Sequence, residues 1–342
     1  MTLHLISLPH TETTASYSWC AFSSLVGAFS TMMTRYGTEV ILYAGEDNEA
    51  ECAEHVVVSD KPANTEPFVP PWTPEYFEPM NLRVIKEMHK RIKPGDLILR
   101  QQGPCTEVVQ RAFPNVSVEP ICGYAGATAP AKVYPSEAWR HLVLGWQCGL
   151  RGENVHTIWG MSSDATIPHF LDVDKFPQGD GGDYLLFVGR LGGMKGDNIA
   201  AQVAEQLGIP LKVAGPGPPP AYGEYLGVVK PKERAELMGG ALAVMTPSQF
   251  PEPFCLVAIE AQMCGTPVLA TDWGAFTETV EQGVTGYRCN TVDEFVRGVK
   301  EAKALDRDAI RERAIRLYSY DAVAPQYAAY FDRIATLGMG TP

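Results

Sequence analysis

The 342-residue sequence lacks the signals of several large classes of protein. No apolar run approaches the ~20 residues that a membrane-spanning helix requires. The opening segment Leu3–Leu8 is too short for a signal peptide and has no basic flank, so it predicts a first strand. The sequence has no Walker ending Gly-Lys-Ser/Thr and no Gly-x-Gly-x-x-Gly fingerprint. These absences count against a P-loop nucleotidase and a nicotinamide-dependent oxidoreductase.

The eight cysteines form no Cys-x-x-Cys pair and no cluster with histidine, and we expect no metal site. Several lie inside apolar runs, where a free cysteine behaves as a small hydrophobic residue. Reduced thiols are typical of the cytoplasm, which is the expected location (the host cytoplasm for a viral protein).

Positive charge is also scarce. Lysine and arginine total 28 against 40 acidic residues, a net charge of −12, which argues against non-specific binding of nucleic acid. One basic stripe, Arg83, Lys86, Lys90 and Lys93, has helical spacing. It can meet an anionic partner, but the solvated face of a surface helix is the interpretation we favour, since lysine is usually exposed.

Strand and helix signals alternate along the whole chain, a pattern typical of parallel α/β domains. Polar, glycine-rich residues 174–183 suggest a boundary, so we predict a first domain over 1–176 and a second over 183–320. An amphipathic helix is predicted over Asp321–Leu337, within a C-terminal segment 321–342. The predicted strands are Leu3–Leu8, Glu39–Tyr43, Asp96–Arg100, Val116–Glu119, Tyr184–Arg190, Leu211–Ala214, Ala241–Thr246 and Pro267–Thr271, with a long helix near Tyr17–Tyr36.

Residues 60–81 are rich in proline and aromatic side chains, and they are too long for a plain connection. We predict a loop here. It forms either part of a lid over a binding site or a surface loop held by its aromatic residues.

The most informative segment is Pro251–Ala261, in which Glu252 and Glu260 lie eight positions apart around the start of an apolar helix. Pro253 is suited to a first helical turn. The amides of Phe254, Cys255 and Leu256 are then first-turn donors that can bind phosphate or hydroxyl oxygens. Eight residues of helix span roughly 12 Å, which lets one carboxylate meet a sugar ring and the other a ribose, with a diphosphate between them.

Two further segments carry polar groups at the ends of predicted strands, where open α/β sheets bind ligands. Gly189–Gly196 contains Arg190 and Lys195, and Thr246-Pro247-Ser248 ends a later strand. Fixed cations of this kind stabilise negative charge that develops on a leaving group.

These segments resemble the retaining glycosyltransferases of family 4. Pro251–Ala261 resembles the family motif E-P-F-G-L-x-x-x-E-A, with Cys255 in place of its glycine, and Gly189–Gly196 resembles Gly-Arg-x4-Lys-Gly. Thr166–Phe176 resembles the interdomain segment of the family, and Gly274–Glu278 resembles its GG-x-x-E turn with Ala275 replacing a glycine. The loop Ser7–Trp19 resembles that of bacterial and bacteriophage members.

The resemblance implies a GT-B fold, in which two Rossmann-like α/β domains face each other across a cleft and the C-terminal helix crosses back to the first. It implies transfer of a sugar from a UDP- or GDP-linked donor, without metal or other cofactor. Glu252 then orients the donor sugar, Glu260 holds the ribose, and Arg190 and Lys195 hold the diphosphate. The predicted donor-binding residues are Phe254, Cys255, Leu256, Glu260, Thr246, Ser248 and Gly189.

The first domain departs more from the family pattern, so the acceptor is left open between a glycan, a protein and a hydroxymethylated base in phage DNA. His10, Thr11 and Tyr124 are the candidate acceptor-side residues. The alternatives are a nucleotide-sugar epimerase of the same fold and a non-catalytic binder of sugar nucleotides. The sequence does not indicate the oligomeric state.

Overall fold

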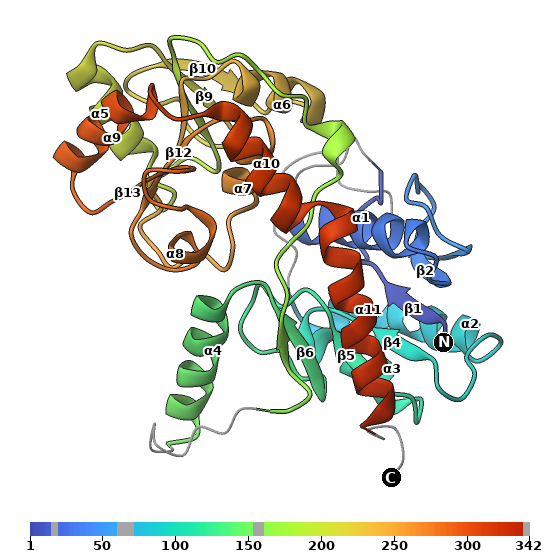
Figure 1. The fold of residues 1–342 in the computed structure, drawn as a ribbon. Coiled ribbons are helices and arrows are strands. Elements are labelled where there is room, and N and C mark those ends of the chain that lie inside the picture. Colours follow the sequence, from blue (N-terminus) through green and yellow to red (C-terminus); the bar gives the residue numbers. More distant parts are fainter. Residues whose placement is uncertain (15–19, 60–71, 153–160, 338–342) are drawn as a thin grey trace. The chain divides into compact units, whose positions relative to one another are not determined.

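A computed structural model describes residues 1–14, 20–59, 72–152 and 161–337 of the chain (Figure 1). Its contacts divide the chain into two compact units. The first contains residues 1–169 and 323–342, and the second contains residues 170–322. Both units are parallel α/β domains, as the sequence predicts.

The first unit is built on a seven-stranded sheet of order β3-β2-β1-β4-β5-β6-β7. All the strand pairs of this sheet are parallel. Its strands are β1 (Leu3–Ile6), β2 (Val40–Gly45), β3 (Glu54–Ser59), β4 (Leu97–Leu99), β5 (Ser117–Glu119), β6 (Ala131–Tyr134) and β7 (Ala165–Thr166). Its helices are α1 (Ala21–Arg35), α2 (Pro74–Met88), the 3-10 turn η1 (Gly103–Thr106), α3 (Glu107–Arg111) and α4 (Glu137–Leu150).

The second unit has a six-stranded parallel sheet of order β10-β9-β8-β11-β12-β13. Its strands are β8 (Leu185–Val188), β9 (Leu211–Ala214), β10 (Glu224–Gly227), β11 (Ala243–Thr246), β12 (Val268–Thr271) and β13 (Gly286–Cys289). Its helices are η3 (Val173–Lys175), α5 (Asp197–Leu207), α6 (Pro231–Gly239), α7 (Leu256–Met263), α8 (Phe276–Thr279), α9 (Val292–Ala302) and α10 (Arg307–Tyr318).

The central strands are buried on both faces, which is why they read as apolar runs in the sequence. In β8, Leu185 and Phe187 belong to one core cluster and Leu186 to another. Successive side chains of a strand point to opposite faces, so the sheet separates these two cores.

The last helix, α11 (Tyr320–Thr336), begins in the second unit, and its residues from Val323 onward belong to the first. Within the first unit, the Tyr327 hydroxyl donates to Pro120 O at 2.7 Å and the Tyr330 hydroxyl to Ser163 O at 2.8 Å. Residues 170–176, placed by the sequence in the first domain, join the second unit because Leu171 and Phe176 are buried in its core.

The predicted loop over residues 60–81 is wrong in its second part. Helix α2 begins at Pro74, a residue type that suits the first turn, and it buries Phe77 and Met80. Residues 60–71, including Phe68, lie outside the described residues, as do Tyr17–Trp19 of the predicted first helix.

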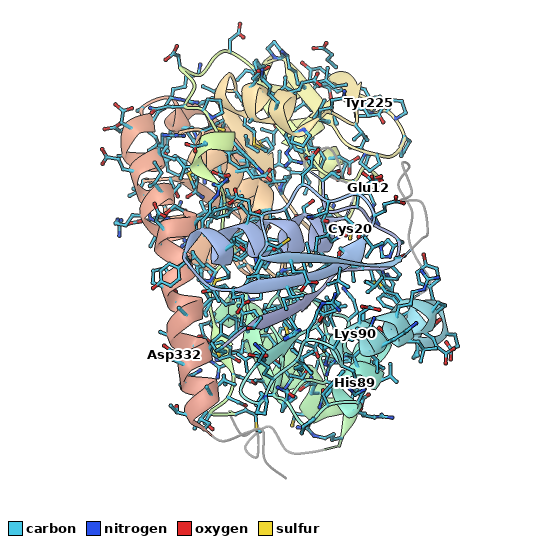
Figure 2. The ribbon with its side chains drawn as sticks, turned by 90° about the vertical axis from the view of Figure 1, so that its right-hand side faces the viewer. Glu12, Cys20, His89, Lys90, Tyr225 and Asp332 are labelled. Atoms are coloured by element: carbon cyan, nitrogen blue, oxygen red, sulfur yellow. The ribbon has the colours of Figure 1, made fainter. Side chains whose placement is uncertain are left out.

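The residues of the basic stripe are exposed, in agreement with their interpretation as a solvated surface. Arg83 and Lys86 are exposed on α2, whereas Lys90 and Lys93 come after the helix ends. Figure 2 labels Lys90, whose ammonium pairs with Glu87 at 2.6 Å.

His169, in the segment that joins the two units, gives a prediction about acid stability. Burial lowers the pKa of this imidazole from 6.5 to about 3. The unfolded chain therefore binds a proton below pH 6.5 that the folded chain does not, and stability falls as the pH drops from 6.5 toward 3. Between pH 7.5 and pH 4.5, the free energy of unfolding measured with urea should fall by ~2–3 kcal/mol less in His169→Asn than in wild type. His141 is exposed, so His141→Asn is the control. An equal loss of stability at acid pH in wild type and in both variants would contradict the role given to the buried His169.

Candidate functional site

The strand order of the second sheet reverses between β8 and β11. Crevices at the carboxyl ends of strands, at such a switch point, are where open α/β sheets bind ligands. Gly189–Gly196 follows β8 and Pro247–Phe254 follows β11, so the two segments with the strongest sequence signals meet at this edge.

Backbone contacts hold the two loops together. The Gln249 amide donates to Met194 O at 2.9 Å. Gly196 has a φ of 79°, and a Cβ at this position would lie 2.0 Å from Pro247 O. Only glycine allows this approach, so the turn that carries Lys195 is fixed against the end of β11.

Glu252 is the central acidic group of this edge and is only 4% exposed. Its Oε1 accepts hydrogen bonds from Lys195 Nζ and from Ser248 Oγ, each at 2.6 Å. The Glu252 carbonyl also accepts from the Ala275 amide at 3.2 Å. A buried carboxylate is costly without such partners, so the loop holds it in one position.

The turn at Gly274 supports Glu252 from the other side. Gly274 has a φ of 58°, and a Cβ there would lie 2.9 Å from Glu252 N. The partial match to the GG-x-x-E turn therefore has a physical basis at its first glycine. Ala275, in place of the second, has an ordinary helical φ of −65° and is buried.

Lys195 has a side chain 35% exposed that pairs with Glu252 while its ammonium lies 4.9 Å from the centre of the Phe250 ring. Arg190 is exposed at the start of the same loop. The neighbouring amide of Gly193 donates to the Asp197 carboxylate at 2.8 Å, which fixes the glycine turn at the start of α5.

Glu260 lies on α7 and is 5% exposed. Its Oε1 accepts from Arg234 Nη2 at 2.9 Å. Its Oε2 is buried and has no hydrogen-bond partner among the described residues. A buried acceptor without a partner costs free energy, so this oxygen can take a hydrogen bond from a ligand hydroxyl. Arg234 was not predicted, because an arginine on a polar helix such as α6 gives no local signal of burial.

The expected start of the helix after Glu252 needs correction. Cys255 has φ 69° and ψ 84°, a left-handed conformation, and α7 begins at Leu256 rather than near Pro253. A left-handed residue ends one segment and cannot continue a right-handed helix. The first-turn amides are therefore those from Leu256 onward. Phe254 is buried against Tyr318, with ring centroids 5.8 Å apart.

The conformation of Cys255 explains why glycine suits this position in the family motif. We predict that Cys255→Gly is about 1 kcal/mol more stable than Cys255→Ala, reversing the usual order, because alanine is strained at positive φ. Chemical unfolding of both variants measures the difference. A more stable alanine variant would contradict the conformation.

The thiol of Cys255 is not poised for chemistry. Burial, with a smaller contribution from Glu252, raises the pKa of this thiol to about 12. The thiol therefore stays neutral at physiological pH.

The remaining donor-side candidates have structural partners. The Thr246 hydroxyl donates to Leu269 O at 3.4 Å, and the Gly189 amide donates to Ala214 O at 3.0 Å. Ser248 supports Glu252, a contact that the sequence did not predict.

The three acceptor-side candidates lie in the first unit. His10 and Thr11 are buried in the loop after β1, where the Thr11 hydroxyl donates to Leu8 O at 3.3 Å. Tyr124 follows β5, and its hydroxyl accepts from the Gln102 amide at 2.6 Å and donates to the Glu119 carboxylate.

The chain contains two Asp-x-Asp sequences, Asp172-Val173-Asp174 and Asp306-Arg307-Asp308. Asp172 caps the turn η3 by accepting from the Asp174 amide at 3.3 Å, and Asp306 caps α10 by accepting from the Asp308 amide at 2.9 Å. Within the described ranges, no group of three histidine, cysteine or acidic side chains is arranged to hold a metal ion. No helix in those ranges combines the length and the apolar character that a membrane crossing requires.

Comparison with known sequences places residues 223–317 in the family model "Glycosyl transferases group 1". The phosphatidyl-myo-inositol mannosyltransferase of Mycobacterium leprae is 31% identical over 121 residues, 33% of this chain and 32% of that protein. The glycogen synthase of Mycobacterium tuberculosis is 26% identical over 234 residues, 54% of this chain and 56% of that protein. The matches thus span about a third to about half of these relatives.

Solved structures match nearly the whole chain. A glycosyltransferase involved in avilamycin A biosynthesis has a TM-score of 0.70 at 22% identity, covering 98% of both chains. HepE of Anabaena, solved in complex with UDP and glucose, has a TM-score of 0.70 at 14% identity, covering 97% of this chain and 100% of that one. Identities this low show the fold. The solved structures therefore show that the chain has the GT-B fold of glycosyltransferases, and the family match places residues 223–317 of its second unit with the group 1 glycosyltransferases.

Proposed function

We propose that the protein is a retaining glycosyltransferase that takes a sugar from a UDP- or GDP-linked donor. The observation that carries the proposal is the buried Glu252 carboxylate, fixed by Lys195 and Ser248 at the switch point of the second sheet. The HepE structures that hold UDP and UDP-glucose support a nucleotide sugar as the ligand.

The donor would bind to groups of the second unit. The ribose hydroxyls would donate to the unpartnered Oε2 of Glu260, which Arg234 holds in place. Arg190, Lys195 and the first amides of α7 would bind the diphosphate, because cations and a helix N-terminus both favour an anion. Glu252 would then accept hydrogen bonds from the donor sugar.

The same groups would lower the barrier to transfer. Cleavage of the bond between the sugar and the phosphate leaves negative charge on the diphosphate and positive character on the sugar ring. Lys195 and Arg190 would stabilise the first charge and Glu252 the second. For retention, the departing phosphate oxygen would take the proton of the acceptor hydroxyl, which attacks the same face of the sugar.

Proton NMR of the products tests this proposal. The protein is incubated with UDP-glucose or GDP-mannose, and the anomeric signal of the first product is followed before mutarotation. Retention predicts an α product from these α-linked donors, and EDTA should not slow its formation. A β product would contradict retention. An altered nucleotide sugar without transfer would indicate an epimerase instead.

A further inference from the structure

The first unit has its own switch point. Its strand order reverses between β1 and β4, and the register pairs Leu5 with Leu99. Extending this parallel register by two residues brings Ser7 opposite Gln101 just beyond the two strands. Adjacent strands lie roughly 4.8 Å apart, so the two residues are neighbours at the edge where α/β sheets bind ligands.

Both residues carry buried polar atoms without partners. Gln101 is 1% exposed, and neither its Oε1 nor its Nε2 has a hydrogen-bond partner among the described residues. The same holds for Ser7 Oγ and for Nε2 of the neighbouring Gln102. Buried donors and acceptors are normally paired, so a set of unpaired ones at a switch point indicates a binding site for a ligand that offers hydroxyl groups.

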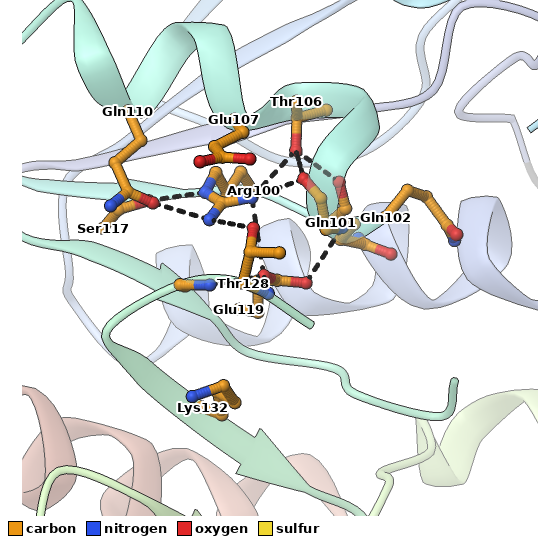
Figure 3. Close-up of polar contacts among 12 residues, drawn as sticks. Arg100, Gln101, Gln102, Thr106, Glu107, Gln110, Ser117, Glu119, Thr128 and Lys132 are labelled. Carbon is orange, nitrogen blue, oxygen red and sulfur yellow. Dashed lines mark hydrogen bonds and ion pairs between the residues drawn. The ribbon is translucent and has the colours of Figure 1, made fainter. Parts of the chain in front are cut away.

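The charged groups beside these amides are already neutralised. Arg100 and Glu119 are fully buried, and Arg100 Nη1 lies 3.4 Å from Glu119 Oε1 (Figure 3). All three guanidinium nitrogens of Arg100 donate hydrogen bonds, and the Glu119 Oε1 accepts from the amides of Thr128 and Ala129 at 2.7 and 2.8 Å. This cluster therefore offers a ligand no free charge.

The turn that presents the two glutamines is rigid. Gln102 has a φ of 67°, and its amide is bound by the Tyr124 hydroxyl. A Cβ at the following residue, Gly103, would lie 2.1 Å from Gly126 O. Figure 3 shows the side chains of Gln101 and Gln102 on one side of the Arg100–Glu119 cluster.

An aromatic surface adjoins the loop after β1. The Trp72 ring, 40% exposed, lies 5.5 Å from the His10 ring, and the Tyr76 ring lies 6.2 Å from it. Large aromatic rings of this kind offer an apolar face, which suits the C–H face of a sugar.

We propose that this edge binds the acceptor and that the acceptor is a neutral sugar or other polyol. The inference rests on the proposed glycosyltransferase function. Ser7, Gln101 and Gln102 would pair with hydroxyl groups of the acceptor, and Trp72 would contact its apolar face. Neutral amides at this edge favour a neutral glycan over a phosphorylated acceptor or DNA.

UDP release from UDP-glucose is measured with methyl α-glucoside, methyl α-mannoside and myo-inositol as neutral probes, and with glucose 6-phosphate as the charged probe. We expect a neutral probe to accelerate release, and Gln101→Leu to raise the KM for that probe at least tenfold. The matched control is Gln206→Leu, at an exposed position of α5, which should leave this KM unchanged. The melting temperature of Gln101→Leu should not fall, because the substitution removes unpaired polar atoms.

Acceleration by glucose 6-phosphate alone, or by no probe, would overturn the proposal. An unchanged KM in Gln101→Leu would do the same, and a lowered melting temperature would indicate a structural role instead. Calorimetric titration with UDP and with GDP tests the donor site separately. Failure to bind either nucleotide would overturn the proposed function, and this inference with it.

Discussion

Glu252→Gln is expected to lower the rate of sugar transfer ~10³-fold while UDP still binds. Glutamine has the shape of glutamate and can still accept a hydrogen bond from Ser248, but it removes the charge. The Glu252 carboxylate is 4% exposed. In the proposed mechanism it lies beside the positive character that develops on the sugar ring, and a fixed negative charge is most effective at such a buried position. Single-turnover kinetics with saturating donor measure the loss.

Glu236→Gln is the matched control, since Glu236 is exposed on α6 of the same unit. It should transfer sugar at the wild-type rate. Transfer by Glu252→Gln within threefold of wild type would remove Glu252 from the chemistry. Loss of UDP binding in this variant would instead assign Glu252 a role in holding the nucleotide.

Lys195→Met is expected to lower kcat by ~10²–10³-fold, because it removes a fixed cation from the side of the leaving diphosphate. Methionine keeps most of the apolar stem of lysine and removes only the ammonium, which lies 4.9 Å from the centre of the Phe250 ring. The buried Glu252 carboxylate then loses its 2.6 Å ion pair, so the variant should also be less stable. Steady-state kinetics and chemical unfolding report the two effects separately.

Lys212→Met provides the control for loss of a lysine over an aromatic ring. Lys212 lies on β9, and its ammonium is 4.1 Å from the centre of the Tyr184 ring. This lysine has no proposed role in transfer. Its kcat should equal that of wild type. A Lys195→Met enzyme with wild-type kcat and a raised KM alone would show that the cation serves binding and not the transition state.

The sequence predicted the central strands of both sheets but not the outer ones. β8, β9, β11 and β12 are apolar runs bounded by glycine or proline, so their burial on both faces is visible in composition. β10 (Glu224–Gly227) and β13 (Gly286–Cys289) are edge strands whose residues are partly exposed. Short, mixed segments like these are specified by pairing with a neighbour, which a single sequence does not reveal.

The candidate site likewise has residues that the sequence predicted and residues that it did not. Glu252, Glu260 and Lys195 lie in motifs whose spacing is local, and the structure brings Lys195 and Glu252 into contact. Arg234, which pairs with Glu260, comes from a separate helix and carried no signal. Gln101 was also missed, because a glutamine after a strand looks like an ordinary exposed residue until its burial and lack of partners are known.

The left-handed Cys255 shows how one residue can shift an element. The sequence placed the helix start at Pro253 because proline suits a first turn. The actual start is set by backbone conformation two residues later, and cysteine gives no sign of a positive φ.

The most direct test of the proposed donor site compares UDP with 2′,3′-dideoxy-UDP by calorimetric titration of wild type and Glu260→Gln. Hydrogen bonds to a charged acceptor contribute about 1.5–3 kcal/mol, so wild type should bind UDP roughly 10–100-fold more tightly than the dideoxy analogue. Glu260→Gln should discriminate less between the two, since a neutral amide oxygen accepts a weaker hydrogen bond than a carboxylate does. Equal binding of both nucleotides by wild type, or undiminished discrimination in Glu260→Gln, would contradict a ribose site at Glu260.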